Sequence, residues 1–325
     1  MKLFDVLKRN DFLRATVKKA KIYREFLYDA KEISKYYLEA SEPNGRKEYR
    51  IMLLVHSLEK GMCMPSPRPF GYDKAIYLMK ILSAYDENKR SEFEYKLGVA
   101  VLDAWRSFYE SHGWTDQKGY KTISDFLIKV GEVDLTAGWK IMSAPNVSED
   151  SSFDDVIFSR HSVRDFAETP LKEEDIKYAL KCFIEAPTAC NRQMCKVYLV
   201  KNPDMKKKLD TTIMGVGGFN KRVVNYFIIT YDMASLDYFG ERNQGHLNTG
   251  LVAMNFVNGL HARGIGSCFM QWSNKYSEDV QIRKLLKIPE SERIGIVIGA
   301  GYYLPESVIP CSGRKSIEDI YRVIE

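Results

Sequence analysis

A short polar stretch near the middle of the chain concentrates groups that can bind a phosphate. It places two arginines, a histidine and a hydroxyl within six residues, just before a predicted helix: Ser159-Arg160-His161-Ser162-Val163-Arg164-Asp165-Phe166. Guanidinium groups donate paired hydrogen bonds to phosphate oxygens, and a hydroxyl adds a further donor. The stretch therefore predicts a phosphate-binding segment, although a solvated charged loop has the same composition.

A second polar stretch follows about twenty residues later, between a predicted helix and a predicted strand. It reads Glu185-Ala186-Pro187-Thr188-Ala189-Cys190-Asn191-Arg192-Gln193. Its small residues let a planar ligand approach the backbone, and Thr188, Asn191 and Gln193 offer polar contacts.

Motifs for other chemistries are absent from the sequence. It contains no GxxxxGK[ST], HExxH or GxSxG, and the glycines of 215–218 and 299–301 do not complete GxGxxG, so we interpret both groups as turns. The five histidines form no metal-like cluster, and the six cysteines form no CxxC pair. We therefore expect no metal site, and reduced thiols in a cytoplasmic protein.

Hydrophobic periodicity predicts the elements that position the polar stretches. A helix is expected to begin at Thr169-Pro170 and to carry an acidic first turn, 173–175. Strands are predicted at 197–200, 223–230, 267–272 and 294–298. The helix predicted over 245–262 is apolar nearly all round, which favours burial in a core or between subunits.

The first half of the chain, residues 1–140, is predicted to be helical throughout. Apolar residues recur at helical spacing in 22–37, 51–58 and 93–108. The polar stretch 143–152 contains a proline and is typical of a linker. We therefore divide the chain into a helical domain, 1–142, and an α+β domain, 153–325.

The composition fits a globular protein of one large or two smaller domains: 325 residues, of which 45% are hydrophobic. The net charge of +5 is spread along the chain and argues against a nucleic-acid binder. No apolar run is long enough to cross a membrane, and the N-terminus lacks a signal peptide's apolar run. Residues 1–24 carry eight basic and two acidic residues, which leaves two interpretations: a solvated helix face, or contact with an anionic membrane surface.

Taken together, the two polar stretches resemble the FMN-dependent nitroreductase family. Its members carry Arg-[Arg/His]-Ser-x-Arg-x-Phe and then Ala-Pro-Ser-x-x-Asn-x-Gln-Pro. In this chain, residues 160–166 match the first motif and residues 186–193 match the second. Thr188 replaces the usual Ser, and Met194 replaces the usual Pro. Three further pieces occur in the family's order: Phe219-Asn220, Gly264-Ile265-Gly266-Ser267 and Gly313-Arg314-Lys315-Ser316-Ile317-Glu318-Asp319. The resemblance covers about residues 153–325.

The resemblance implies a nitroreductase-like fold, with a mixed sheet flanked by helices, in an interlocked homodimer with FMN at the subunit interface. The implied phosphate ligands are Arg160, Ser162 and Arg314, with backbone from His161, while Arg164 assists or pairs with Asp165. The implied flavin contacts are Pro187, Thr188, Ala189, Asn191, Asn220, Met270 and Gln271. No catalytic side chain is implied, because the flavin carries the chemistry. Ser312 departs from the family, where many members have a second basic residue.

The implied activity is that of an FMN-dependent NAD(P)H oxidoreductase. Hydride passes from NADH or NADPH to flavin N5, and electrons then pass to a nitroaromatic, quinone or activated alkene in a ping-pong scheme. The N-terminal half resembles an extension of nitroreductase-like proteins of surface-polysaccharide biosynthesis, so a metabolite of glycan assembly is one expected acceptor. The alternatives are a reductive dehalogenase-like or flavin-fragmenting offshoot, and a flavin-binding scaffold or sensor whose helical half is the interaction surface.

Two smaller hypotheses concern the ends of elements. The segment 56–62 runs into the proline loop 65–71. It is either a helix end with Gly61 at the C-cap, or part of a lid in which Glu59, Lys60, Arg68 and Phe70 select the acceptor. At the C-terminus, Ile320–Ile324 is expected to add an edge strand to the sheet of a partner subunit.

Overall fold

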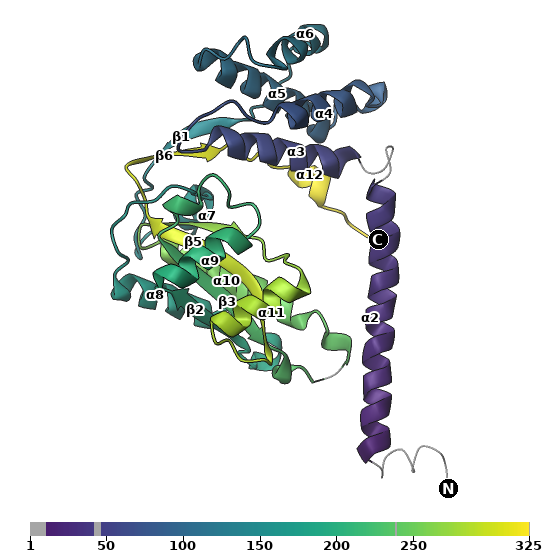
Figure 1. Cartoon of the computed structure of the whole chain (residues 1–325), viewed down its shortest axis with the longest axis vertical. Coiled ribbons are helices and arrows are strands. Elements are labelled where there is room, and N and C mark those ends of the chain that lie inside the picture. Colours follow the sequence, from purple (N-terminus) through teal and green to yellow (C-terminus); the bar gives the residue numbers. More distant parts are fainter. Residues whose placement is uncertain (1–10, 42–46, 238, 325) are drawn as a thin grey trace. The chain divides into compact units, whose positions relative to one another are not determined.

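The chain forms two compact units, each assembled from segments that are distant in sequence (Figure 1). The computed structural model describes residues 11–41, 47–237 and 239–324. The sheet unit draws on Met1–Ser41 and Pro145–Leu304, and the helical unit on Glu42–Ala144 and Pro305–Glu325. The domain boundary at 143–152 stays a prediction.

The sheet unit is built on four strands in the order β2-β3-β5-β4. These are β2 (Cys195–Val200), β3 (Asn225–Asp232), β5 (Glu292–Tyr302) and β4 (Ile265–Met270). Each coincides with a predicted strand to within a few residues. Neighbouring strands of this sheet pair antiparallel, and a parallel bridge joins Ser162 to Ser267 beside β4.

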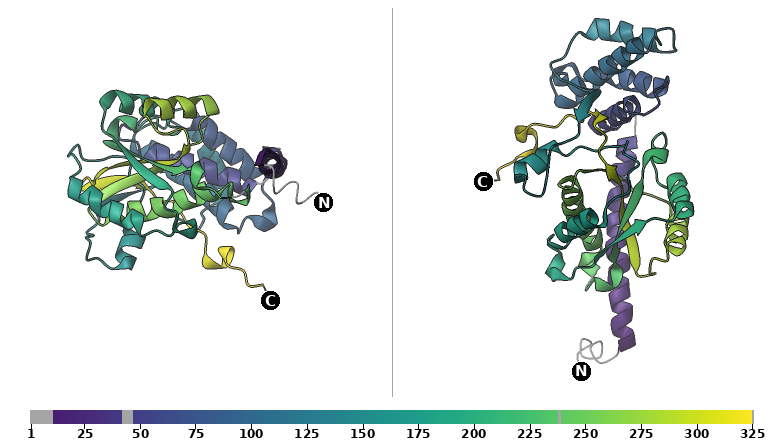
Figure 2. Two further views of the ribbon diagram at one scale, coloured as in Figure 1. Left: turned by 90° about the horizontal axis from the view of Figure 1, so that it is seen from below. Right: turned by 90° about the vertical axis from the view of Figure 1, so that its left-hand side faces the viewer.

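Helices cover both faces of the sheet, which explains the continuous apolar run of β3. Figure 2 shows α8 (Glu173–Ile184) and α10 (Gln244–His261) on one side, and α9 (Pro203–Thr212) and α11 (Tyr276–Leu285) on the other. The short helix α7 (Phe153–Ser159) precedes the first polar stretch. The prediction of a long helix at 245–262 is confirmed, but its Leu247, Leu251 and Met254 side chains are 37–58% exposed in this chain.

Helix α8 begins later than predicted. Its first residue is Glu173, so the expected start at Thr169-Pro170 is wrong, although the acidic first turn is present. Hydrogen bonds to Tyr302 hold the preceding backbone in place: the amide of Ala167 donates to the Tyr302 carbonyl, and the amide of Lys172 donates to its hydroxyl. These contacts with β5 occupy the residues that the cap prediction assigned to the helix.

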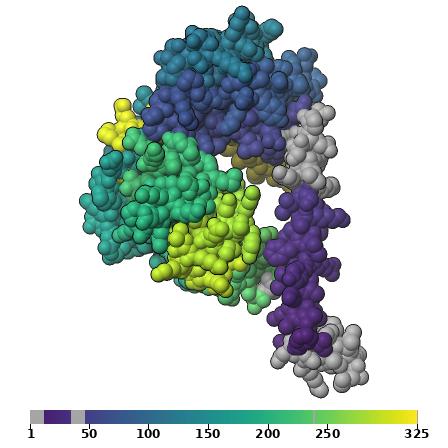
Figure 3. Space-filling view, viewed as in Figure 1, coloured from purple at the N-terminus to yellow at the C-terminus, as the bar shows by residue number. Residues whose placement is uncertain are grey.

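The long helix α2 (Asp11–Ser41) contacts the rest of its unit through charged side chains. Arg242 forms ion pairs with Asp29 and Glu25. Ile22, Phe26 and Ile33, from the predicted apolar stripe, are 42–67% exposed. Figure 3 shows the helix that carries them in purple. The periodicity therefore predicted the helix correctly, but those three side chains are not buried in this chain.

The basic N-terminal segment is only partly described. Lys2, Lys8 and Arg9 lie outside the described residues. Among the residues that the structure does describe, no helix is both long enough and apolar enough to span a membrane.

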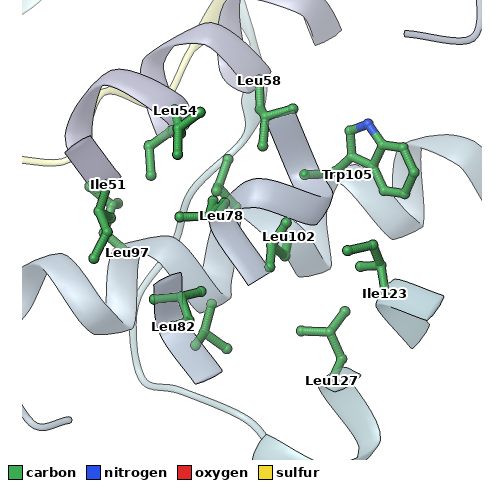
Figure 4. Packing of buried hydrophobic residues seen from close by; sticks show 14 of the residues in the cluster. Ile51, Leu54, Leu58, Leu78, Leu82, Leu97, Leu102, Trp105, Ile123 and Leu127 are labelled. Atoms are coloured by element: carbon green, nitrogen blue, oxygen red, sulfur yellow. The ribbon is translucent and has the colours of Figure 1, made fainter. Parts of the chain in front are cut away.

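The helical unit packs α3 (Lys47–Met62), α4 (Tyr72–Ser83), α5 (Phe93–Ser111) and α6 (Tyr120–Val130) around one apolar core. Its centre contains fully buried side chains from all four helices, among them Leu58, Leu78, Leu102, Trp105 and Ile123 (Figure 4). The sequence prediction missed an antiparallel pair of strands, β1 (Trp139–Ser143) with β6 (Glu306–Pro310). After α12 (Ile317–Ile320), residues 321–324 form no strand in this chain.

Candidate functional site

The first polar stretch lies along the outer edge of β4. The amide of Val163 donates to the Ser267 carbonyl over 3.0 Å, next to the bridge between Ser162 and Ser267. Val163 and Phe166 are buried, so these two side chains anchor the segment in the core. The side chains of Arg160, His161 and Ser162 belong to half-buried residues. This edge therefore presents several donors in a fixed arrangement.

Glycines of β5 make room for this segment. A Cβ at Gly301 would lie 2.6 Å from Cβ of Phe166, and one at Gly299 would lie 2.3 Å from Cε of Met270. Both glycines are inside the strand, so the interpretation of 299–301 as a turn is wrong. The turn predicted around Gly215 and Gly218 is present, and both have positive φ.

Arg164 is the most informative residue of the site. Its side chain is buried, with 8% of the residue exposed, yet Nε and Nη1 have no hydrogen-bond partner. The guanidinium carbon lies 5.8 Å from the centroid of the Phe219 ring. A buried cation without acceptors is costly, so this arrangement fits a ligand that brings an anion or polar acceptor.

The neighbouring carboxylate does not neutralise Arg164. Oδ1 of Asp165 lies 3.2 Å from Nε of Arg222 and accepts a hydrogen bond from the Phe166 amide. The proposed pairing of Arg164 with Asp165 is therefore wrong, because Arg222 takes that role.

Two charged groups, Arg160 and His161, lie close enough to His261 to affect its pKa. Burial, together with the charges of Arg160 and His161, lowers the pKa of His261 to about 4. His261 is therefore uncharged at neutral pH. The donor set therefore suits a phosphate better than a cation.

Three further predicted residues lie near the same half of the sheet. Asn220 opens the short helix η3 (Asn220–Arg222) just before β3 and follows Phe219, which contacts Arg164. Met270 ends β4 and is buried, whereas Gln271 is exposed. In the strand register, Ser267, Ala300 and Asn225 form one row across the sheet, so these pieces share one region.

The second polar stretch lies at the other end of β3. Cys195 pairs with Tyr231, and the amide of Asp232 donates to the Met194 carbonyl over 2.9 Å. Six residues of strand separate Tyr231 from Asn225, which is about 20 Å. Within one chain the structure therefore does not bring Pro187, Thr188, Ala189 and Asn191 to the Arg160–Arg164 segment.

The backbone of that stretch is unusual. Cys190, Asn191 and Gln193 have φ of 52°, 53° and 48°, in the left-handed region that non-glycine residues seldom adopt. Thr188 stabilises the turn, because its Oγ1 accepts from the Gln193 amide and its carbonyl accepts from the Asn191 amide. Strained backbone of this kind clusters at functional sites.

Arg314 belongs to the helical unit, and its role toward a phosphate stays a prediction. Its Nη1 donates to the Ser312 carbonyl over 2.6 Å. Neighbouring Lys315 pairs with Glu94, which is buried in the helical unit. The effect of Ser312 on cofactor binding likewise stays a prediction.

The lid hypothesis loses two of its four residues. Glu59 is 2% exposed and accepts hydrogen bonds from the amides of Gly138 and Ser312. The Phe70 ring packs edge-on against Phe108 and closes over Gly61. Both side chains are therefore used inside the helical unit, and since α3 extends to Met62, the C-cap interpretation of Gly61 is also wrong.

Within the described ranges, no group of three or more histidine, cysteine, aspartate or glutamate side chains is placed to hold a metal ion.

The fold and this edge define an α+β domain with a helix-covered antiparallel sheet and a cationic segment beside its edge strand. Residues 157–222 and 239–302 match the family model described as the Nitroreductase family. This match confirms the resemblance inferred from the sequence, and this part of the chain has a nitroreductase-like fold.

Individual proteins are similar to about half of this chain. A protein of Archaeoglobus fulgidus, provisionally named NADH dehydrogenase/NAD(P)H nitroreductase, is 24% identical over 147 residues, which cover 45% of this chain and 83% of the relative. Among solved structures, an FMN-dependent nitroreductase from Clostridium difficile R20291 is 22% identical, covers 45% of this chain and 85% of its own, and has a TM-score of 0.40. A provisionally assigned nitroreductase from Desulfovibrio desulfuricans, solved in complex with FMN, is 17% identical, with coverages of 52% and 95% and a TM-score of 0.44.

Proposed function

We propose that the sheet unit binds FMN and that the protein is an FMN-dependent NAD(P)H oxidoreductase. The match to the Nitroreductase family and the FMN named for its relatives support this proposal. The observation that carries it is the buried, unpartnered guanidinium of Arg164 beside the edge of β4. FMN offers the acceptors that this cation lacks.

The residues at this edge have different proposed roles in binding the cofactor. Arg160 and Ser162 bind the phosphate, with backbone from His161. Arg164 and Asn220 would donate hydrogen bonds to the flavin, and the backbone of Met270 and Gln271 would contact its ring system. The flavin, when bound, supplies hydride and electron transfer between NAD(P)H and an acceptor. The protein's own contribution is therefore binding and orientation.

We propose a homodimer in which a second copy completes each site. Tyr231, which pairs with Cys195 beside the second polar stretch, lies about 20 Å along β3 from the row that carries Ser267, and we infer that the two polar stretches do not meet in one chain. A partner's loop supplies the missing side. The exposed Leu247, Leu251 and Met254 side chains of α10 offer an apolar face for the contact.

The acceptor class is a nitroaromatic, quinone or activated alkene, and a metabolite of surface-polysaccharide assembly is the proposed natural acceptor. We place the protein in the cytoplasm, which agrees with the free thiols of all six cysteines. The proposal includes a peripheral contact between the basic residues of α2 and an anionic membrane surface.

Purified protein should bind FMN tightly enough to be yellow and should release FMN, not FAD, on denaturation. It should then oxidise NADH or NADPH with menadione as the acceptor. A protein that fails to bind added FMN would refute the proposal. Flavin binding without NAD(P)H oxidation would instead favour a flavin-binding scaffold.

A further inference from the structure

His261 is fully buried at the end of α10, and both of its ring nitrogens have partners. Nε2 lies 2.8 Å from Oγ of Ser159, the last residue of α7. Nδ1 lies 2.8 Å from the hydroxyl of Tyr303, just after β5. The histidine therefore connects two segments that meet beside Arg160.

The direction of these hydrogen bonds follows from the donor and acceptor capacities of the groups. Ser159 Oγ also contacts the Asp155 carbonyl, which only accepts, so the hydroxyl proton of Ser159 is donated there. Ser159 Oγ then accepts from Nε2–H of His261. Nδ1 is consequently the unprotonated nitrogen, and it accepts from the Tyr303 hydroxyl.

The surroundings maintain the neutral ring that this arrangement needs. Burial, with the charges of Arg160 and His161, holds the pKa of His261 at about 4, so the ring is uncharged at neutral pH. Gly266 makes room for the phenol, because a Cβ there would lie 2.9 Å from Cε1 of Tyr303. The relay, defined as Tyr303, His261 and Ser159, is therefore closely packed as well as fully hydrogen-bonded.

We propose that the relay is a positioning device for the phosphate-binding segment. It fixes the end of α7 one residue before Arg160, while the bond from Val163 to Ser267 fixes the segment two residues after His161. Arg160, His161 and Ser162 are thereby held between two anchors. The relay residues themselves do not touch the ligand, and the inference rests on the proposed FMN site.

The test compares two flavins that differ in the phosphate. Dissociation constants for FMN and riboflavin are measured by quenching of flavin fluorescence in wild type, Ser159→Ala and Tyr303→Phe. These substitutions remove one hydroxyl each and keep the packing. Losing one hydrogen bond of the relay should weaken FMN binding about 3- to 10-fold. Riboflavin, which has no phosphate, should bind within about 2-fold of wild type.

Two further variants sharpen the comparison. In the double variant Ser159→Ala/Tyr303→Phe, a relay that acts as a unit should lose little more FMN affinity than the worse single variant. His246→Phe is the matched control, because His246 is also on α10 and its Nε2 lies 3.1 Å from the Tyr231 hydroxyl. This control should leave the ratio of FMN to riboflavin affinity unchanged.

The results of these binding measurements test the relay and the proposed function separately. Equal losses for FMN and riboflavin, or no loss for either, would overturn the relay while FMN binding by wild type stands. The same holds if His246→Phe changes the ratio as much as the relay variants. If wild type binds neither flavin, both the relay and the proposed function are overturned.

Discussion

Arg192 and Glu241 hold the loop 188–193 through a two-point ion pair, with Nη2 to Oε1 at 2.7 Å and Nη1 to Oε2 at 2.8 Å. The same guanidinium donates to the carbonyls of Ser235 and Ala189. Because three residues of this loop have left-handed backbone, the ion pair stabilises a conformation that the local sequence alone disfavours. Arg192 was named in the sequence motif only as a variable position.

Replacing Glu241 should therefore destabilise the loop in a pH-dependent way. Hydrogen bonds from Arg192 lower the pKa of Glu241 to about 2. A carboxylate with a depressed pKa stabilises the folded state above its unfolded value of roughly 4.3, and this stabilisation is lost as the pH falls toward 2. The melting temperature of Glu241→Gln should lie below that of wild type at pH 7, and the difference should shrink between pH 4 and pH 2. Glu173→Gln, in an exposed pair with Lys177, is the control and should change little.

Arg164→Met should act in opposite directions on the apoprotein and on FMN binding. Removing a buried cation without acceptors should stabilise the apoprotein by about 1–3 kcal/mol. Losing the cation's contact with the cofactor should weaken FMN binding roughly 10- to 150-fold. Chemical denaturation and flavin titration measure the two effects. Lower apoprotein stability with unchanged FMN affinity would mean that Arg164 is only structural.

Leu251→Asp should convert the proposed dimer into monomers. Leu251 lies in the exposed apolar face of α10, and a buried charge in an interface has a high desolvation cost. Light scattering at micromolar concentration measures the mass. Ile128→Asp, at an exposed position on α6, is the control and should leave the mass unchanged. A monomeric wild type with FMN bound would contradict the shared site.

Glu59→Ala should lower stability without altering the choice of acceptor. The substitution leaves the buried amide of Gly138 and the half-buried amide of Ser312 without this acceptor, at a cost of about 1–3 kcal/mol. Denaturation and stopped-flow kinetics with small and bulky acceptors measure stability and selectivity. Arg68→Ala, which changes an exposed residue of the proline loop, tests the remaining part of the lid. Changed selectivity in Arg68→Ala at unchanged stability would restore the lid hypothesis.

Gly61→Ala should destabilise the helical unit even though alanine favours helices. A Cβ at Gly61 would lie 2.0 Å from Cε2 of Phe70, and overpacking of this kind costs about 1–3 kcal/mol. Gly217→Ala is the control, since a Cβ there meets nothing within 4 Å and the change should raise stability by about 0.4–1 kcal/mol. Thermal melts of both variants check the sign of each change, and a Gly61→Ala protein as stable as wild type would mean that Phe70 moves aside freely.

Local patterns in the sequence were sufficient for the four strands of the sheet unit and for α10. Alternation and helical spacing report which residues face a core, and this information lies within a few neighbouring positions. The motif also indicated the family, because its residues are contiguous in the chain. The same local information misplaced the start of α8, which depends on contacts with Tyr302, more than 120 residues away.

The features that the sequence did not predict depend on contacts between segments that are distant in the chain. The pairing of β1 with β6 joins residues more than 160 positions apart, and the burial of Glu59 depends on Gly138 and Ser312. The strand register separates Thr188 from the Ser162 edge, although both belong to one family motif in sequence. The hydrogen bonds of His261 likewise arise only where α7, α10 and the end of β5 meet. Each of these contacts depends on which surfaces pack together. Hydrophobic periodicity predicts that a face is buried, but it does not predict which other element covers that face.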